Sequence, residues 1–145
     1  MLYFTPSGKM PATDVCEPQV VRALEKAGWT VVRHHYPMFI PALDRYLLAD
    51  LLIEHGQATA MIVEIKCFQD QGRFHDDFYH AVGQYMTYRS LLRLNGDSYP
   101  LYLSVPLETF EVYFDLPHIK AVIDDARIQM VVIDLAAEEV SAWLT

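Results

Sequence analysis

Apolar positions along the chain recur with helical spacing in some segments and form short continuous runs in others, which predicts both helices and strands. In the first helical segment Val20 and Leu24 lie on one apolar stripe, and Gly28 follows where helices commonly stop. A longer helical segment ends at Asn95-Gly96, which is also a typical stop. The predicted helices cover residues 15–27, 75–96, 109–116 and 118–126.

The continuous apolar runs are short enough to be buried strands. Residues 37–41, which begin and end with proline, are expected to form a loop, and residues 138–145 either a last strand or a short helix. Gly56, Gln57 and Ala58 separate two neighbouring runs, which favours a β-hairpin. The predicted strands cover residues 29–36, 46–55, 59–68, 101–106 and 128–135.

In this order the elements predict an α/β fold with a central mixed β-sheet flanked by helices. Residues 10–145 are expected to form a single domain, because no repeat, low-complexity tract or linker interrupts them. Residues 1–9 are expected to be a loose N-terminal extension.

The second run of the hairpin carries two charged residues, Glu64 and Lys66, within an apolar strand. Burying a charge without compensation costs several kcal/mol, so the strand is exposed, the charges are paired, or they have a function. Alternation predicts that Ile62, Glu64, Lys66 and Phe68 share one face, while Val63, Ile65 and Cys67 pack the core from the other.

A turn centred on Gln57 places Asp50 directly opposite Glu64, with both side chains on the same face. Two neighbouring carboxylates repel each other unless a divalent cation lies between them, and Mg²⁺ prefers oxygen ligands. With Lys66 on the same face, this arrangement suits metal-assisted phosphodiester hydrolysis. The alternative is a solvated face of alternating charge, and a register slip by one residue would separate the two acids.

Composition changes this picture mainly through charge. The hydrophobic content of 52% argues against disorder, and no apolar run reaches the roughly 18–20 residues of a membrane span. The net charge of −8 is unlike that of a free-standing DNA-binding protein, so DNA binding would need a local patch, metal ions or a partner. The N-terminus lacks the features of a signal peptide, which favours a cytoplasmic location.

The arrangement of Asp50 followed by Glu64-Ile65-Lys66 on the next strand resembles the PD-(D/E)XK nuclease superfamily, with Ala49 in place of a weakly kept proline. Gln84 and Tyr88 resemble the QxxxY motif of its RecB-type branch, in which i and i+4 residues share a helix face. The alternatives are an exposed helix position for Gln84 and a core aromatic for Tyr88. The resemblance implies a restriction-endonuclease-like core.

The chain as a whole resembles the XisH family, the excision controlling factors of cyanobacterial fdxN elements. The segments MPATD, ALEKAGWTV, VEIKCF, AVGQYMTYRSLL and LYLSVP carry this resemblance from residue 10 onward, which suggests Met10 as a natural start. The resemblance implies a role in DNA rearrangement together with an XisI-type partner protein and a recombinase. It does not imply established catalysis.

Glu17 has two open interpretations. Many superfamily members carry a metal-binding glutamate on the first helix, whereas Asp14 and Glu17 have the spacing of a capping box, and Pro18 also suits a helix start.

The remaining histidines and cysteines are weaker candidates. His34 and His35 should face opposite ways on a strand, and His75 and His80 should be separate surface residues. Cys16 and Cys67, without CxxC spacing, predict neither a structural disulfide nor a zinc knuckle.

Two functions therefore remain open. The first is a DNA endonuclease that depends on Mg²⁺ or Mn²⁺ and supports site-specific recombination. Asp50, Glu64 and the Ile65 carbonyl would hold the metal, Lys66 would stabilise negative charge, and Gln84, Tyr88 and Glu17 would complete the site. The second is a catalytically silent accessory protein that binds an XisI-type partner and supports a recombinase. A homodimer remains open in both, and neither involves a membrane.

Overall fold

The computed structural model describes residues 3–4, 15–57 and 59–145. Its helices are α1 (Glu17–Lys26), α2 (Phe74–Leu94), α3 (Leu107–Tyr113) and α4 (Pro117–Ala126), with single 3₁₀ turns at Pro41–Leu43 and Gln71–Arg73. Its strands are β1 (Tyr3–Phe4), β2 (Thr30–Ile40), β3 (Arg45–His55), β4 (Thr59–Ile65), β5 (Leu101–Pro106), β6 (Met130–Asp134) and β7 (Glu139–Leu144).

The described strands form one mixed sheet of seven strands in the order β1-β3-β4-β5-β6-β7, with β2 also paired to β3. β4, β5 and β6 run parallel, while the β2–β3, β3–β4 and β6–β7 pairs are antiparallel. The predicted α/β fold with a central mixed sheet flanked by helices is therefore confirmed.

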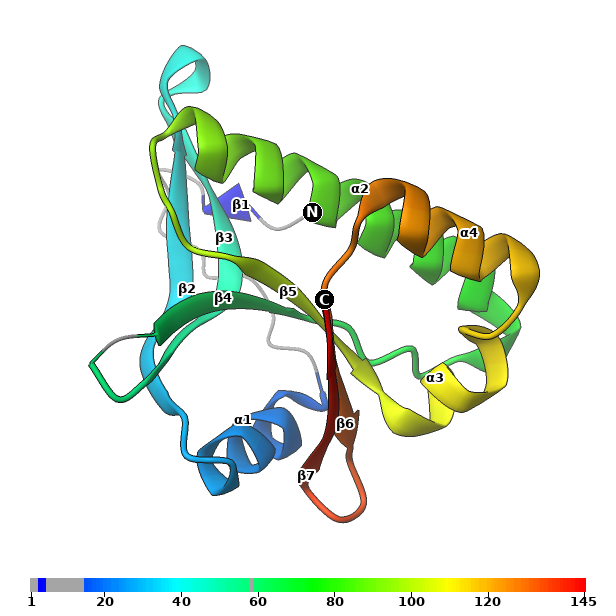
Figure 1. The fold of residues 1–145 in the computed structure, drawn as a ribbon. Helices are drawn as coiled ribbons and strands as arrows, with labels where there is room; N and C mark the ends of the chain where they lie inside the picture. Colours follow the sequence, from blue (N-terminus) through cyan, green and yellow to red (C-terminus); the bar gives the residue numbers. More distant parts are fainter. Residues whose placement is uncertain (1–2, 5–14, 58) are drawn as a thin grey trace.

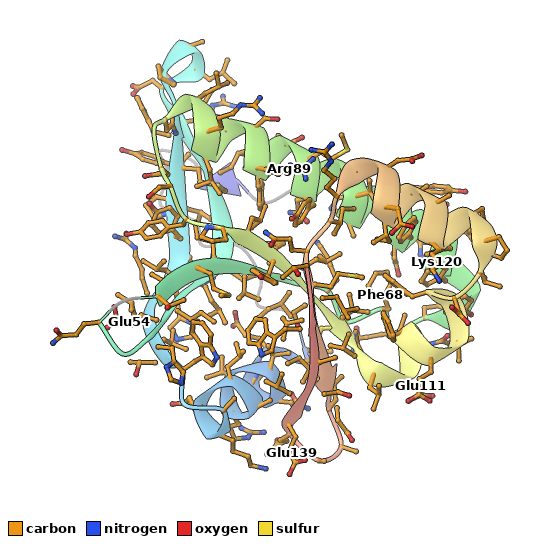
Figure 2. All side chains as sticks on the ribbon, viewed as in Figure 1. Glu54, Phe68, Arg89, Glu111, Lys120 and Glu139 are labelled. Atoms are coloured by element: carbon orange, nitrogen blue, oxygen red, sulfur yellow. A yellow bond between two sulfur atoms is a disulfide. The ribbon has the colours of Figure 1, made fainter. Side chains whose placement is uncertain are left out.

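The helices cover both faces of the sheet (Figure 1). α1 lies on one face, and α2 and α4 lie on the other, where α3 joins them. Each face has its own apolar cluster, one that includes Phe74, Tyr85 and Ile119 and one that includes Val20, Leu24 and Val63. Phe68 lies in the interior, whereas Glu54, Glu111 and Glu139 extend outward (Figure 2).

The central hairpin has the predicted register. β3 and β4 pair from Leu51↔Val63 to His55↔Thr59, so Asp50 and Glu64 are the next positions along each strand. The expectation that only one face of β4 packs the core was wrong. Val63 and Ile65 pack toward α1, and Ile62 and Phe68 pack on the α2 side because α2 covers that face.

Two strands end three or more residues away from their predicted ends. Residues 37–40, predicted as part of a loop, continue β2, and Pro37 pairs with Leu48. Proline is tolerated there because, among the described strands, β2 pairs with β3 alone, so no described strand needs a donor on its other edge. β4 ends at Ile65, earlier than predicted, and Phe68 has a φ of 49° that no regular strand adopts. The final segment is the strand β7, which decides between the two alternatives.

The N-terminal segment contributes to the sheet. Tyr3 and Phe4, which belong to the expected loose extension, form β1 and pair with Leu47 and Tyr46 of β3. Asp14 of the expected capping box lies outside the described residues. α1 begins at Glu17 without a side-chain cap hydrogen bond from its N-cap residue, Cys16, and Pro18 follows in the first turn.

A disulfide joins Cys16 to Cys67, with 5.8 Å between their Cα atoms. The prediction that the chain has no structural disulfide was therefore wrong. Sequence spacing was uninformative because the two cysteines are 51 residues apart and meet only where the start of α1 packs beside the end of β4.

None of the described helices is long and apolar enough to span a bilayer.

Candidate active site at the end of the central hairpin

The candidate site lies where β3 and β4 separate. β2 runs along one edge of β3, so β1 and β4 share the other edge. β4 pairs with β3 only up to Leu51, while β1 pairs with Tyr46 and Leu47. Asp50 lies in the gap between these two partners, and Glu64 lies beside it on the departing strand.

Asp50 and Glu64 are joined by reciprocal hydrogen bonds at this point. The Asp50 backbone N–H donates to Glu64 Oε1 at 3.1 Å, and the Ile65 N–H donates to Asp50 Oδ2 at 2.7 Å. Each carboxylate thus takes a backbone donor from the opposite strand, which replaces the next rung of the ladder. The two predicted acids are side by side, as the hairpin register required, and they do not diverge.

Lys66 completes this group. Its Nζ lies 3.8 Å from Glu64 Oε2, which has no hydrogen-bond partner among the described residues. The backbone N–H of Lys66 donates to the Ser104 carbonyl at 3.1 Å, so β5 holds the lysine in place just beyond the end of β4. The Lys66 side chain is 18% exposed, whereas that of Glu64 is 1% exposed.

The environment of Glu64 favours its protonated form. Burial raises the pKa of Glu64 well above its ordinary value, and the neighbouring Asp50 raises it further. Lys66 and the Asp50 backbone N–H oppose this shift but are the weaker effects. A cation at Glu64 Oε2 would reverse the balance, because it would stabilise the ionised carboxylate in place of the proton.

Gln84 and Tyr88 contact each other on one face of α2, as their spacing predicts. Gln84 Nε2 donates to the Tyr88 hydroxyl at 2.9 Å, and this hydroxyl donates to the Leu48 carbonyl at 3.2 Å. α2 is thereby tied to β3 two residues before Asp50. The alternative of an exposed Gln84 was wrong, since Gln84 is 2% exposed, while Tyr88 does belong to the core.

Glu17 is the first residue of α1 and is largely buried. The preceding residue, Cys16, is bonded to Cys67, which directly follows Lys66. The disulfide therefore holds the start of α1 at the end of the strand that carries the other acids. A metal-binding role for Glu17 stays a prediction.

His35 is a neighbour of the site that sequence reasoning missed. The pairs His34↔Leu51 and Tyr36↔Ala49 place it across from Asp50, and its φ of 56° departs from strand geometry. Its Nδ1 is buried without a hydrogen-bond partner among the described residues. The expectation that His34 and His35 face opposite ways rested on regular alternation, which this backbone conformation interrupts, and no sequence signal announces it.

The residues fit a divalent cation only with help from neutral ligands. No cluster of three or more His, Cys, Asp or Glu side chains suited to a metal occurs among the described residues. Glu64 Oε2 and Gln84 Oε1 are, however, buried oxygen atoms without hydrogen-bond partners there. Two carboxylates supplemented by a carbonyl oxygen and water form the oxygen-rich set that Mg²⁺ accepts.

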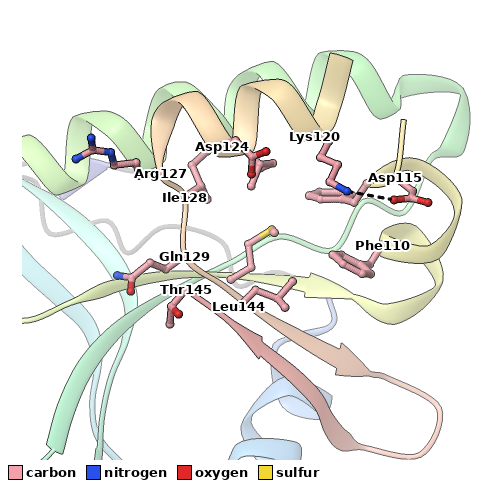
Figure 3. A pocket seen from close by; sticks show the side chains of 12 residues that line it. Phe110, Asp115, Lys120, Asp124, Arg127, Ile128, Gln129, Leu144 and Thr145 are labelled. Carbon is pink, nitrogen blue, oxygen red and sulfur yellow. Dashed lines mark ion pairs between the residues drawn. The ribbon is translucent and has the colours of Figure 1, made fainter. Parts of the chain in front are cut away.

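A cleft and a larger cavity bear on where a substrate could lie. A polar cleft of about 280 Å³ adjoins Lys66 and is also lined by Arg73, Asp77 and His80. A larger cavity of about 590 Å³ lies between α3, α4 and the ends of β6 and β7, where Phe110, Lys120 and Leu144 line it (Figure 3). Lys66 of the carboxylate site lines the smaller cleft, whereas no residue of that site lines the larger cavity.

Fold and site together define an α/β domain that carries a buried carboxylate pair and an adjoining lysine on its central hairpin. The chain belongs to the XisH family, whose sequence pattern, described as XisH protein, matches residues 10–141.

Two solved structures are similar to this chain. An XisH family protein from Nostoc punctiforme PCC 73102 has a TM-score of 0.82 and 28% identity, covering 91% of this chain and 100% of that protein. A fdxN element excision controlling factor protein from Anabaena variabilis has a TM-score of 0.82 and 29% identity, covering 92% of this chain and 100% of that protein. A search of curated proteins gave no match.

Proposed function

We propose that this XisH-family chain acts in excision control as a divalent-metal-dependent DNA endonuclease that supports site-specific recombination. The observation that carries the proposal is the contact of Asp50 with Glu64 across the separating strands. Lys66 Nζ lies 3.8 Å from a Glu64 oxygen that has no hydrogen-bond partner within the described part of the chain. The described function of the Anabaena variabilis relative, control of fdxN element excision, supports the role in DNA rearrangement.

Asp50, Glu64 and the Ile65 carbonyl would hold Mg²⁺ or Mn²⁺. A bound divalent cation supplies Lewis-acid polarisation of a phosphoryl oxygen and a water of lowered pKa. Lys66 stabilises the negative charge that develops on the phosphate, and the low exposure around it strengthens that interaction relative to water. Gln84 positions the substrate or water through its amide oxygen, while Tyr88 and Leu48 fix the amide's orientation.

One observation favours the alternative of a catalytically silent accessory protein. Asp50 and Glu64 are only 4% and 1% exposed, and each already accepts a backbone hydrogen bond. A site in this state must open before a phosphodiester can reach it. In the alternative function, the chain binds an XisI-type partner and assists a recombinase, and the acids serve only to join β3 to β4.

The test combines cleavage with metal binding. The protein, alone and with an XisI-type partner, is incubated with supercoiled DNA and Mg²⁺ or Mn²⁺, and Mn²⁺ binding is measured in parallel by electron paramagnetic resonance. Glu64→Ala and Lys66→Ala are the test variants, and Glu54→Ala serves as the control because Glu54 is an exposed acid on the same hairpin.

We expect both test variants to lose cleavage by at least about 100-fold, as for removal of a transition-state contact. Glu64→Ala should also lose Mn²⁺ binding, whereas Lys66→Ala should keep it and Glu54→Ala should resemble the unchanged protein. Absence of cleavage under every condition, or equal cleavage by all variants, would reject the nuclease function. Binding of the partner by a non-cleaving protein would then support the accessory function.

A further inference from the structure

A pair of histidines lies on the surface where the starts of α2 and α4 meet. His75 Nε2 and His118 Nε2 are 2.9 Å apart, and their rings are nearly parallel, at an interplanar angle of 5°. Both side chains are exposed. Each is the second residue of its helix, so two segments 43 positions apart present the same ring nitrogen to one point.

We propose that His75 and His118 form a binding site for a divalent transition metal such as Zn²⁺, Ni²⁺ or Cu²⁺. Neutral imidazole nitrogen is a preferred ligand of these ions, and Nε2 is one of its two ligating atoms. The two histidines supply two ligands, and water fills the remaining positions. The proposal is independent of the proposed nuclease function.

The distance between the two nitrogens suits a shared metal after a small adjustment. With Zn–N bonds of about 2.0–2.1 Å and tetrahedral angles, two ligating nitrogens lie about 3.3 Å apart. The observed 2.9 Å needs an opening of a few tenths of an ångström, which exposed side chains provide by small rotations. Without metal, the Nε2–H of one ring donates a hydrogen bond to the Nε2 of the other ring. The shared proton then lies between the two nitrogens, where the metal would bind.

Charges at this junction both weaken and strengthen cation binding. The N-termini of α2 and α4 carry partial positive charge, which weakens cation binding. Asp76 and Asp77 in the first turn of α2 oppose this effect, as does the overall charge of −8. Nitrogen ligation makes the site selective, because Mg²⁺ prefers oxygen ligands and keeps its water.

A metal at this point would fasten the α3–α4 segment to the start of α2. The junction is already packed, since Phe74 stacks on Tyr113 at a ring distance of 3.9 Å. Arg73 and Asp77, at the same end of α2, line the cleft beside Lys66. Metal binding would therefore stiffen one wall of that cleft.

The experiment measures Zn²⁺ and Ni²⁺ binding to the full chain by competition with a chromophoric chelator, together with thermal unfolding. His75→Ala and His118→Ala are the test variants, and His80→Ala is the matched control because His80 is exposed on the same helix. Circular dichroism establishes that each variant is folded. Cu²⁺ electron paramagnetic resonance reports the number of ligating nitrogens.

We expect one equivalent of metal that binds at least tenfold more weakly in either test variant and unchanged in His80→Ala. Zn²⁺ at a hundred times its Kd should raise the Tm by about 5–10 °C, and a tenfold excess of Mg²⁺ should not displace it. The Cu²⁺ spectrum should show two nitrogen ligands. Absence of binding, binding that survives both test variants, or equal loss in His80→Ala would overturn the proposal, whatever the result for DNA cleavage.

Discussion

Asp50 and Glu64 illustrate how a buried pair of acids can be tolerated. Each carboxylate accepts a backbone N–H from the other strand, and Lys66 supplies a nearby positive charge. These contacts compensate only part of the cost of burial, so the pKa of Glu64 is raised. Protonation of the pair and folding stability are therefore linked.

The first prediction concerns Glu64→Gln and pH. The pKa of the Glu64 carboxyl is higher in the folded protein than in the unfolded chain, so the folded protein keeps the proton at pH values where the unfolded chain releases it. The stabilising effect is therefore fully present below the ordinary pKa of about 4.5. It is lost as the pH rises through the pKa of the folded state. Each pH unit in that window removes up to about 1.4 kcal/mol. Glu64→Gln should lack this loss, so its free energy of unfolding relative to the unchanged protein should increase with pH.

Urea unfolding between pH 5 and 8 measures this difference without metal. Saturating Mn²⁺ should restore stability to the unchanged protein at the higher pH values and leave Glu64→Gln largely unaffected. Parallel pH profiles for the two proteins would contradict the proposed titration of Glu64.

At the scale of elements, α1 is fastened to the central hairpin by one covalent bond. Cys16 directly precedes the helix, and Cys67 directly follows Lys66. The disulfide therefore joins the sequence neighbours of Glu17 and Lys66. The Cys16 backbone N–H also approaches Cys67 Sγ at 3.3 Å. Loss of the bond would remove the covalent constraint on the start of α1 beside the candidate site.

The second prediction concerns this disulfide. Cys67→Ser should lower the free energy of unfolding by about 2–4 kcal/mol, because the unfolded chain regains the freedom that a closed loop of about 50 residues removes. Denaturant unfolding measures the loss. A thiol reductant should produce a similar loss in the unchanged protein and none in Cys67→Ser. Equal stability of oxidised and reduced protein would contradict the prediction.

The third prediction compares Gly28, which follows a helix, with Gly83, which lies inside one. Gly28, which follows α1, has a φ of 94°, and an added Cβ would lie 2.8 Å from His55 Nε2. Gly28→Ala should therefore destabilise the protein by about 1–2 kcal/mol. Gly83, inside α2, has open space at its Cβ position, so Gly83→Ala should stabilise by about 0.5–1 kcal/mol. Thermal unfolding of both variants tests the opposite signs, and shifts in the same direction would contradict them.

At the scale of the whole molecule, the negative net charge restricts how this chain could bind DNA. The net charge of −8 opposes a polyanion, and the cleft beside Lys66 combines Arg73 and His80 with Asp70 and Asp77. The DNA binding that the proposed function requires would then depend on few phosphate contacts, on divalent cations, or on a partner with positive charge.

The fourth prediction follows for DNA binding by the chain alone. The slope of log K against log[salt] should have a magnitude below about 3, since each phosphate contact contributes about 0.9. Binding should also require Mg²⁺ or Mn²⁺, and Lys66→Ala should reduce the slope by about 1. Fluorescence anisotropy with labelled duplex measures this. A steep slope in the presence of a chelator would show instead an extended basic surface.

The order of the elements and the geometry of the hairpin could be predicted from the sequence because both depend on local information. The spacing of hydrophobic positions distinguishes helices from strands. The turn centred on Gln57 sets the register that places Asp50 beside Glu64. Gln84 and Tyr88 also meet as expected, since i and i+4 spacing fixes a shared helix face.

Only the tertiary structure decided which distant segments meet and how deeply they are buried. The Cys16–Cys67 bond, the His75–His118 contact and the position of His35 across from Asp50 join residues whose separations in sequence carry no signal of proximity. The burial of Glu64 likewise depends on α2 covering β4. The sequence by itself therefore determined which chemical groups the hairpin presents, while packing determined their protonation, their access to solvent and their partners, because those properties arise from contacts between elements.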